Sequence, residues 1–124
     1  MLASRLTAKV ALILALASLA APAAAQYATL DWALGIGSSG NEFANGIAVD
    51  GSGNVYVTGQ FTNTADFDPG AGAASLASAG NTDGFVAKYD ATGAYQWAFA
   101  IGGTGFDFGY AIAVEGAGNL YVAG

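Results

Sequence analysis

The sequence predicts an all-β fold built from repeated four-stranded antiparallel sheets, and three observations lead to this prediction. The body of the chain contains the same pattern twice, 65 residues apart. Within one period, short β-branched and aromatic runs alternate with glycine-rich turns. Outside the N-terminal segment, no window carries an apolar stripe with the 3.6-residue period of a helix. Period, punctuation and missing helical signal together favour a β-repeat architecture.

The first element, residues 1–25, is expected to be a helical signal peptide. Arg5 and Lys9 precede an uncharged Ala/Leu run, and Pro22–Ala25 supplies the small residues of a cleavage site. The alternative is a membrane anchor, which needs about 20 apolar residues, whereas the uncharged stretch Val10–Ala25 has 16. We therefore expect cleavage after Ala25 and no stable membrane insertion afterwards. The body, residues 26–124, is then secreted or extracytoplasmic, in the periplasm or at the cell surface.

The composition of this body excludes several classes of partner and chemistry. It holds all nine acidic residues and one base, Lys88, so its formal charge is 1 − 9 = −8. Nucleic acid is excluded as a partner, because binding to phosphates needs clustered Lys and Arg. The chain has no His and no Cys. This excludes disulfides, Cys/His zinc sites and Ser-His-Asp catalysis within this stretch.

The repeat itself is unambiguous. Trp32–Gly59 aligns without a gap with Trp97–Gly124, and 15 of the 28 positions are identical. One period contains four strand signals joined in pairs by tight turns, with apolar or small residues on both faces, as in a sheet that is covered front and back. The expected hairpins are Ile47–Asp50 with Val55–Phe61, and Gly84–Asp90 with Ala94–Ile101.

Such a unit, repeated at a fixed period, is typical of a β-propeller blade. A β-helix or another solenoid is the competing architecture, but its periods are shorter. We assign residues 30–37 to a fourth-strand equivalent, 47–101 to a full blade and 111–124 to the start of the next, about one and a half blades. A ring of about 4–8 blades needs more. We expect a fragment of a longer protein, with neighbouring blades supplied by that chain or, alternatively, by oligomerisation.

The motifs also carry a family resemblance. The segments are Ile47-Ala-Val-Asp-Gly-Ser-Gly-Asn-Val-Tyr-Val-Thr-Gly59, Asp83-Gly-Phe-Val-Ala-Lys-Tyr-Asp-Ala-Thr-Gly93 and Ile101-Gly-Gly103, with an Asp66-Phe-Asp-Pro-Gly70 insert. They resemble the bacterial SBBP repeat, named for a seven-bladed β-propeller. The first segment is also similar to NHL repeats, but their Asn-x-Arg pattern is missing after Gly59. The resemblance implies an exported bacterial repeat protein without assigned catalytic residues.

Asp66 and Asp68 are the candidate site residues. Residues at i and i+2 of an extended segment lie on one side, so the two carboxylates can share a cation such as calcium or serve as the acid and base of a glycosidase. The alternative is a solvated turn within the 22-residue connection Thr62–Asp83. The oxygen ligands are too few for calcium unless carbonyls or a neighbouring blade contribute.

Two other sets of residues have a structural and a functional interpretation. Asp50–Asn54 and Glu115–Asn119 resemble calcium loops, but hairpin turn chemistry explains every residue in them. Trp32 and Trp97 occupy equivalent positions and can form platforms for sugars, but their apolar same-side neighbours favour packing between blades. We expect turns and core packing in these places.

The function expected from the sequence is that of an exported noncatalytic β-propeller module, with a structural or recognition role at the cell surface or outside the cell. Its partner is a protein or a glycan, and no cofactor is expected. The alternative is part of a propeller lyase or glycoside hydrolase whose active site lies mostly elsewhere. The fold cannot choose between these classes, but the lack of His, Cys and Arg in the body favours the binding module.

Overall fold

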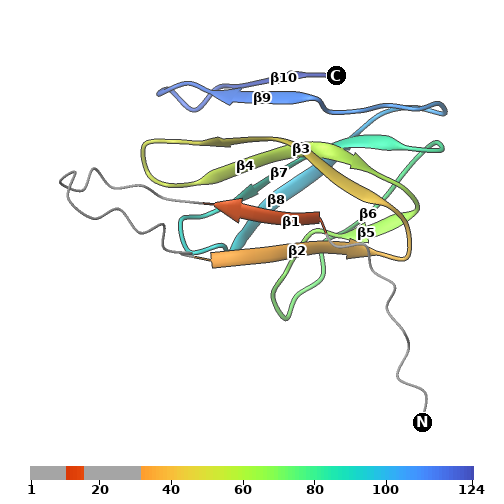
Figure 1. Ribbon diagram of the computed structural model, residues 1–124, viewed down its shortest axis with the longest axis horizontal. Coiled ribbons are helices and arrows are strands. Elements are labelled where there is room, and N and C mark those ends of the chain that lie inside the picture. The colour runs from red at the N-terminus through yellow and green to blue at the C-terminus, as the bar shows by residue number, and fades with distance from the viewer. Residues whose placement is uncertain (1–10, 16–31) are drawn as a thin grey trace, which may run out of the picture.

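The computed structural model describes residues 11–15 and 32–124 of the chain, with the side chains of 32–124 apart from Ser38. This part is all-β and antiparallel, as predicted, and no helix occurs in it (Figure 1). Its strands are β1 (Ala11–Ala15), β2 (Trp32–Ser38), β3 (Glu42–Val49), β4 (Val55–Phe61), β5 (Thr64–Asp66), β6 (Ser75–Ala77), β7 (Asp83–Tyr89), β8 (Tyr95–Ile101), β9 (Ala111–Val114) and β10 (Leu120–Ala123).

The central sheet has the strand order β3-β4-β7-β8, with every neighbouring pair antiparallel. These are the four strands predicted for one period. β3 begins at Glu42, earlier than the expected Ile47, because it pairs with β4 as far as Phe61. A register shift between Ala44 and Gly46 interrupts this pairing. Such an irregularity breaks the two-residue alternation by which strands are recognised in a sequence.

The connection between β4 and β7 contains a hairpin that the sequence did not indicate. Its strands, β5 and β6, pair with each other, and β5 also pairs with β2 through Gly37 with Asp66 and Ser38 with Ala65. The resulting sheet has the order β1-β2-β5-β6. The hairpin β5–β6, here called the insert hairpin, therefore bonds back to a strand that precedes the central sheet.

The expectation of a helix is wrong for the part of the predicted signal peptide that the structure describes. Ala11–Ala15 forms strand β1, antiparallel to β2. An unpaired strand edge offers free N–H and C=O groups to an apolar segment, and β2 offers such an edge. β1 lies beside β2 as β7 lies beside β8, since Ala11 opposes Ile36 and Gly84 opposes Ile101, one period later. Residues 1–10 and 16–25 of the predicted peptide lie outside the described residues.

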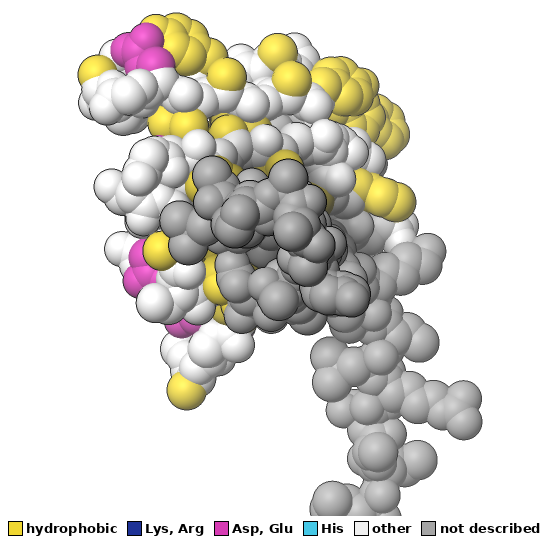
Figure 2. All heavy atoms as spheres, turned by 60° about the vertical axis from the view of Figure 1, so that its left-hand side comes forward, with side chains coloured by type: hydrophobic (Ala, Val, Ile, Leu, Met, Phe, Trp, Pro, Cys, Tyr) yellow, Lys and Arg dark blue, Asp and Glu magenta, His cyan; other side chains and the backbone are white. Residues whose placement is uncertain are grey.

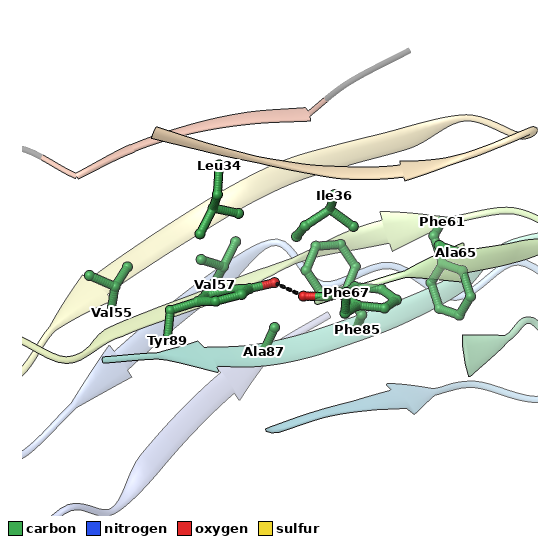
Figure 3. Close-up of a cluster of buried hydrophobic side chains, with 10 residues drawn as sticks. All are labelled: Leu34, Ile36, Val55, Val57, Phe61, Ala65, Phe67, Phe85, Ala87 and Tyr89. Carbon is green, nitrogen blue, oxygen red and sulfur yellow. Dashed lines mark hydrogen bonds between the residues drawn. The ribbon is translucent and has the colours of Figure 1, made fainter. Parts of the chain in front are cut away.

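The hydrophobic core lies between these two sheets (Figure 3). Leu34 and Ile36 point from β2 towards the apolar face of β4 and β7. Three phenylalanine rings fill the space between the sheets, with centroid distances of 4.9 Å for Phe67–Phe85, 5.5 Å for Phe61–Phe67 and 6.4 Å for Phe61–Phe85. Edge-on and tilted arrangements of this kind add to the free energy gained by burial. The insert hairpin thus completes the core by placing Phe67 in it.

On the opposite face of the central sheet, β9 and β10 form a third layer (Figure 1). Their pairing repeats that of β3 and β4 at a distance of one period, because Val114 opposes Leu120 as Val49 opposes Val55. The layer is held by the Gly109 amide, which donates to the Gly59 carbonyl at 3.0 Å. The Asn45 side-chain amide donates to the Gly109 carbonyl at 2.8 Å. The predicted repeat is therefore visible as repeated geometry.

This third layer covers only part of the central sheet. On β8, Phe99 is 48% and Ile101 45% exposed, whereas their equivalents Leu34 and Ile36 are 6% and 0% exposed. Figure 2 shows further hydrophobic side chains exposed at the level of β9 and β10. The molecule therefore presents an apolar face of the kind that its own core covers one period earlier.

Candidate functional site

The hairpin turn after β3 uses its acidic residue as a structural acceptor. One carboxylate oxygen of Asp50 accepts the amides of Ser52 and Asn54, both at 2.9 Å. The other accepts the Asn54 side-chain amide at 2.8 Å and the Tyr56 hydroxyl at 3.0 Å. These bonds, that from the Asn54 side chain first, lower the pKa of Asp50. The carboxylate is therefore engaged in holding the turn.

The other two turns repeat this arrangement. Asp90 accepts the hydroxyl of Thr92 at 2.6 Å and its amide at 2.8 Å, and these bonds lower the pKa of Asp90. Glu115 accepts the Asn119 side-chain amide and, at 3.3 Å, the Tyr121 hydroxyl. Each turn has a glycine with positive φ, at +83°, +86° and +85° for Gly53, Gly93 and Gly118. The geometry agrees with the hairpin interpretation of these segments.

Asp66 and Asp68 lie where β5 ends and the tip of the insert hairpin begins. One oxygen of Asp66 accepts the amides of Asp68 at 3.0 Å and Ala74 at 2.9 Å. One oxygen of Asp68 accepts the Gly70 amide at 2.8 Å. Between them, Phe67 is fully buried, and its carbonyl accepts the Tyr89 hydroxyl at 2.8 Å. The alternation sends the phenyl ring into the core and leaves both carboxylates partly exposed.

This arrangement is poorly suited to calcium as it stands. Calcium takes six to eight oxygen ligands, and in each carboxylate one oxygen already accepts amide hydrogens of its own loop. Within residues 11–15 and 32–124, no three acidic, His or Cys side chains gather at one point. The carboxylate oxygens that accept no loop amide are the ligands this segment offers.

A pocket of about 500 Å³ brings Asp68 together with segments that are distant in the sequence. Its walls are Trp32–Leu34 at the start of β2, Asp68–Gly70 of the insert hairpin and Thr92–Tyr95 of the turn before β8. The arrangement places a carboxylate and an aromatic ring, that of Tyr95, around one opening. Such a combination can hold a ligand by hydrogen bonds and by packing.

Trp32 forms one wall of this pocket, but as a packed side chain. Its indole N–H donates to the Ala91 carbonyl at 3.0 Å, and a Cβ on Gly93 would lie 3.0 Å from its ring. Trp97, one period later, is stacked on Phe99 at 5.4 Å. The indole N–H of Trp32 is thus committed to the turn. The packing interpretation of the two tryptophans agrees with these contacts.

The comparison with known families explains the repeated geometry. Residues 31–68 match the family model of the SBBP beta-propeller repeat. The chain carries an SBBP repeat. The matched segment runs through β2, β3, β4 and β5 and ends at the second candidate carboxylate, Asp68. The resemblance seen in the sequence is thereby confirmed, and the chain is a β-propeller module.

Among curated proteins, "Regulatory protein FlaEY" of Caulobacter vibrioides is 32% identical to this chain over 93 residues. The alignment covers 75% of this chain but 10% of that relative. The chain therefore matches a small part of a much longer protein. Within the described residues, no helix is long and apolar enough to cross a membrane.

Sequence reasoning missed part of the site of the SBBP repeat. Thr92 and Tyr95 border the same pocket as Asp68, and no local pattern indicates this neighbourhood. It arises because the insert hairpin folds back on β2, while Trp32 of β2 packs on the turn at Gly93. The one available signal is the alternation of Asp66, Phe67 and Asp68, which predicts that the carboxylates share a side away from the ring.

Proposed function

We propose that the chain is an exported, noncatalytic β-propeller module with a recognition or structural role outside the cytoplasm. The observation that carries the proposal is the stacking of β9–β10 on the central sheet with the register of β3–β4, one period later. Stacked repeats of this kind present loops from successive units on a shared surface. In this proposal the central sheet is one blade, β2 is the outer strand of the preceding blade, and β9–β10 begins the following one.

Export is supported by the N-terminal pattern of two bases, an apolar run and small residues before Ala25. A chain with no cysteine is suited to an oxidising compartment without depending on disulfides. The acidic body, with a formal charge of −8, gives solubility outside the cytoplasm.

A noncatalytic role is supported by the use that the structure makes of its acidic residues. Catalysis by a general acid needs a carboxyl group that still carries its proton near neutral pH. The hydrogen bonds of the turns lower the pKa values of Asp50 and Asp90 instead. Asp66 and Asp68 likewise accept backbone amides within their own loop. These carboxylates stabilise turns, and the chain has no His or Cys to take their place.

A recognition role is supported by the pocket between the insert hairpin and the turn Thr92–Tyr95. Its one carboxylate, Asp68, and the acidic charge of the body disfavour anionic ligands. We propose a neutral glycan as the ligand class, held by Tyr95 and by polar groups of the two loops. The relative from Caulobacter vibrioides is named as a regulatory protein and not by a reaction, in keeping with such a role.

Export can be tested with the full chain carrying a C-terminal tag in a Gram-negative host. We expect the tagged protein in the extracytoplasmic fraction, with Gln26 as its N-terminal residue by Edman sequencing. The double variant Leu12→Arg with Leu14→Arg interrupts the apolar run and is expected to leave the protein uncleaved in the cytoplasm. An uncleaved wild-type chain in the cytoplasm would contradict the proposal.

Recognition can be tested by titrating the isotope-labelled chain with neutral oligosaccharides, maltoheptaose and chitohexaose. We expect saturable shifts of the amide signals of Thr92–Tyr95, weakened by Asp68→Ala and retained in Asp107→Ala, which lies outside this pocket. The oligosaccharides should be recovered intact. Cleavage of either sugar, or shifts confined to other segments, would argue against a noncatalytic glycan-binding module.

A further inference from the structure

β10 is paired on one side only within the described residues. Its equivalent one period earlier, β4, lies between β3 and β7. β10 pairs with β9, the equivalent of β3, and its other edge has no strand in the described part of the chain. An edge of this kind offers a row of N–H and C=O groups to a further strand.

Beside this edge lies a pocket of about 460 Å³, bounded by Ile101, Phe106–Gly109, Val122 and Gly124, with Gly84 at its base. Shifting three of these residues back by one period gives Ile36, Val57 and Gly59. Ile36 and Val57 belong to the hydrophobic core and are fully buried. Val122 and Ile101 are 38% and 45% exposed. The same apolar surface is thus covered in one copy and open in the other.

A phenylalanine covers this surface in the first copy. Phe85 of β7 opposes Gly59 in register, and a Cβ on Gly59 would lie 2.9 Å from its ring. Gly59 also lies against the carbonyl of Phe43, and Gly124 lies in the same way against the carbonyl of Phe108. The backbone that receives the ring is therefore already formed at Gly124.

The neighbouring positions specify more of the strand that fits. Lys88 opposes Tyr56 and places its ammonium group 5.3 Å from the centre of that ring. The equivalent of Tyr56 is Tyr121, whose side chain is 59% exposed and whose hydroxyl donates to Glu115. A lysine opposite Tyr121 would meet both the face of an aromatic ring and an acidic neighbour. Charge and shape thus point to the same sequence pattern.

We propose that the open edge of β10 and this pocket together form a receptor for a β-strand of the pattern Gly-Phe-Val-Ala-Lys-Tyr, supplied by another SBBP repeat. The phenyl ring enters the pocket opposite Gly124, and the lysine lies over Tyr121. A second copy of this chain is not the donor, since its β7 is already paired on both edges with β4 and β8. The inference does not depend on export or on glycan binding.

The test uses the isotope-labelled full chain and a synthetic peptide with the sequence of residues 82–90. We expect saturable shifts in the amide signals of Leu120–Gly124. A matched peptide with Phe85→Ala should bind at least about tenfold more weakly, because the apolar area that it buries is smaller. A peptide with Lys88→Ala should lose severalfold, as expected for a cation–π contact at a partly exposed site.

Because only the peptides differ, the comparison does not depend on a protein variant that fails to fold. The variant Val122→Asp adds a second check and should abolish the shifts at Leu120–Gly124. The proposal is overturned if the Phe and Ala peptides bind equally, if the shifts map to β4, or if no shift occurs. It is also overturned if the chain associates with itself through β10 and the peptide does not compete.

Discussion

At the scale of single residues, one buried phenol connects the insert loop to the central sheet. The Tyr89 side chain is fully buried, and its hydroxyl donates to the Phe67 carbonyl (Figure 3). Burial raises the pKa of Tyr89 above its usual value of 10.0, with smaller contributions from Tyr95, Asp68 and Asp66. The folded chain therefore keeps this proton at a pH where the unfolded chain releases it.

Tyr89→Phe is expected to lower the free energy of unfolding at pH 7 by about 0.5–1.5 kcal/mol, the usual worth of one hydrogen bond. In the wild-type chain, the contribution of the raised pKa is fully present below pH 10 and decreases as the pH rises further. The variant should lose this part of the alkaline decrease. Urea unfolding between pH 7 and 11 measures both effects, with Tyr121→Phe as the exposed control. An unchanged alkaline slope would contradict the assignment.

Gly93 and Gly118 have nearly the same positive φ but different surroundings. A Cβ on Gly93 would lie 3.0 Å from the Trp32 ring, whereas nothing lies within 4 Å of one on Gly118. Both alanine variants introduce backbone strain of about 1–2 kcal/mol. Gly93→Ala should lose more, because it also displaces Trp32. Thermal unfolding compares the two variants, and equal losses would mean that Trp32 does not pack on the turn.

These turn residues were within reach of sequence reasoning, whereas their neighbours were not. An acidic residue and a following glycine and asparagine predict a tight turn by local chemistry alone, and Asp50, Gly53 and Asn54 do form one. The approach of Asp68 to Tyr95 depends on chain segments far apart in sequence. Local patterns carry no information on such a contact.

At the scale of elements, the insert hairpin shows most clearly what a sequence pattern leaves out. The strands of the central sheet were predicted because each carries enough β-branched and aromatic residues to be recognised. β5 and β6 have three residues each, too few for a periodic signal, and are defined by their pairing with β2 and with each other. β1 was mispredicted for the related reason that an apolar run is compatible with helix and strand until a partner edge decides.

Asp66→Ala and Asp68→Ala test how the tip of the insert hairpin is held. Asp66 accepts two backbone amides and Asp68 one. We expect Asp66→Ala to lower the free energy of unfolding by about 1–3 kcal/mol, since two partly buried donors lose their acceptor. Asp68→Ala should lower it less. Denaturant unfolding monitors both variants, and a larger loss in Asp68→Ala would contradict the observed bonding.

The same loop permits a test for calcium. Because loop amides occupy one oxygen of each carboxylate, we expect millimolar calcium to leave the melting temperature unchanged. A rise in the melting temperature that disappears in Asp66→Ala would instead assign a cation to this loop.

At the scale of the whole molecule, the repeat places equivalent side chains in opposite environments. Leu34 is 6% exposed within the core, and Phe99, one period later, is 48% exposed. Leu34→Ser should destabilise the chain by about 2–5 kcal/mol, as large-to-small changes in a core do. Phe99→Ser should change the stability by about 1 kcal/mol or less, in keeping with a half-exposed site.

Phe99→Ser should also reduce association of the chain, because an exposed apolar face promotes contact between molecules. Urea unfolding measures the first difference and light scattering the second. Similar losses of stability in the two variants would show that the face of β8 is covered in solution.

The pairing of the insert hairpin with β2 also constrains the order in which such a repeat can assemble. The hydrogen-bonded pairs Gly37–Asp66 and Ser38–Ala65 join segments that are both complete before β7 and β8 have been synthesised. A repeat can therefore dock on its predecessor while its own outer strands are still missing. Folding can then advance from the N-terminus one unit at a time, each unit latched by its hairpin, and closing long loops all at once is avoided. Pulling on the chain would have to release these latches in the reverse order.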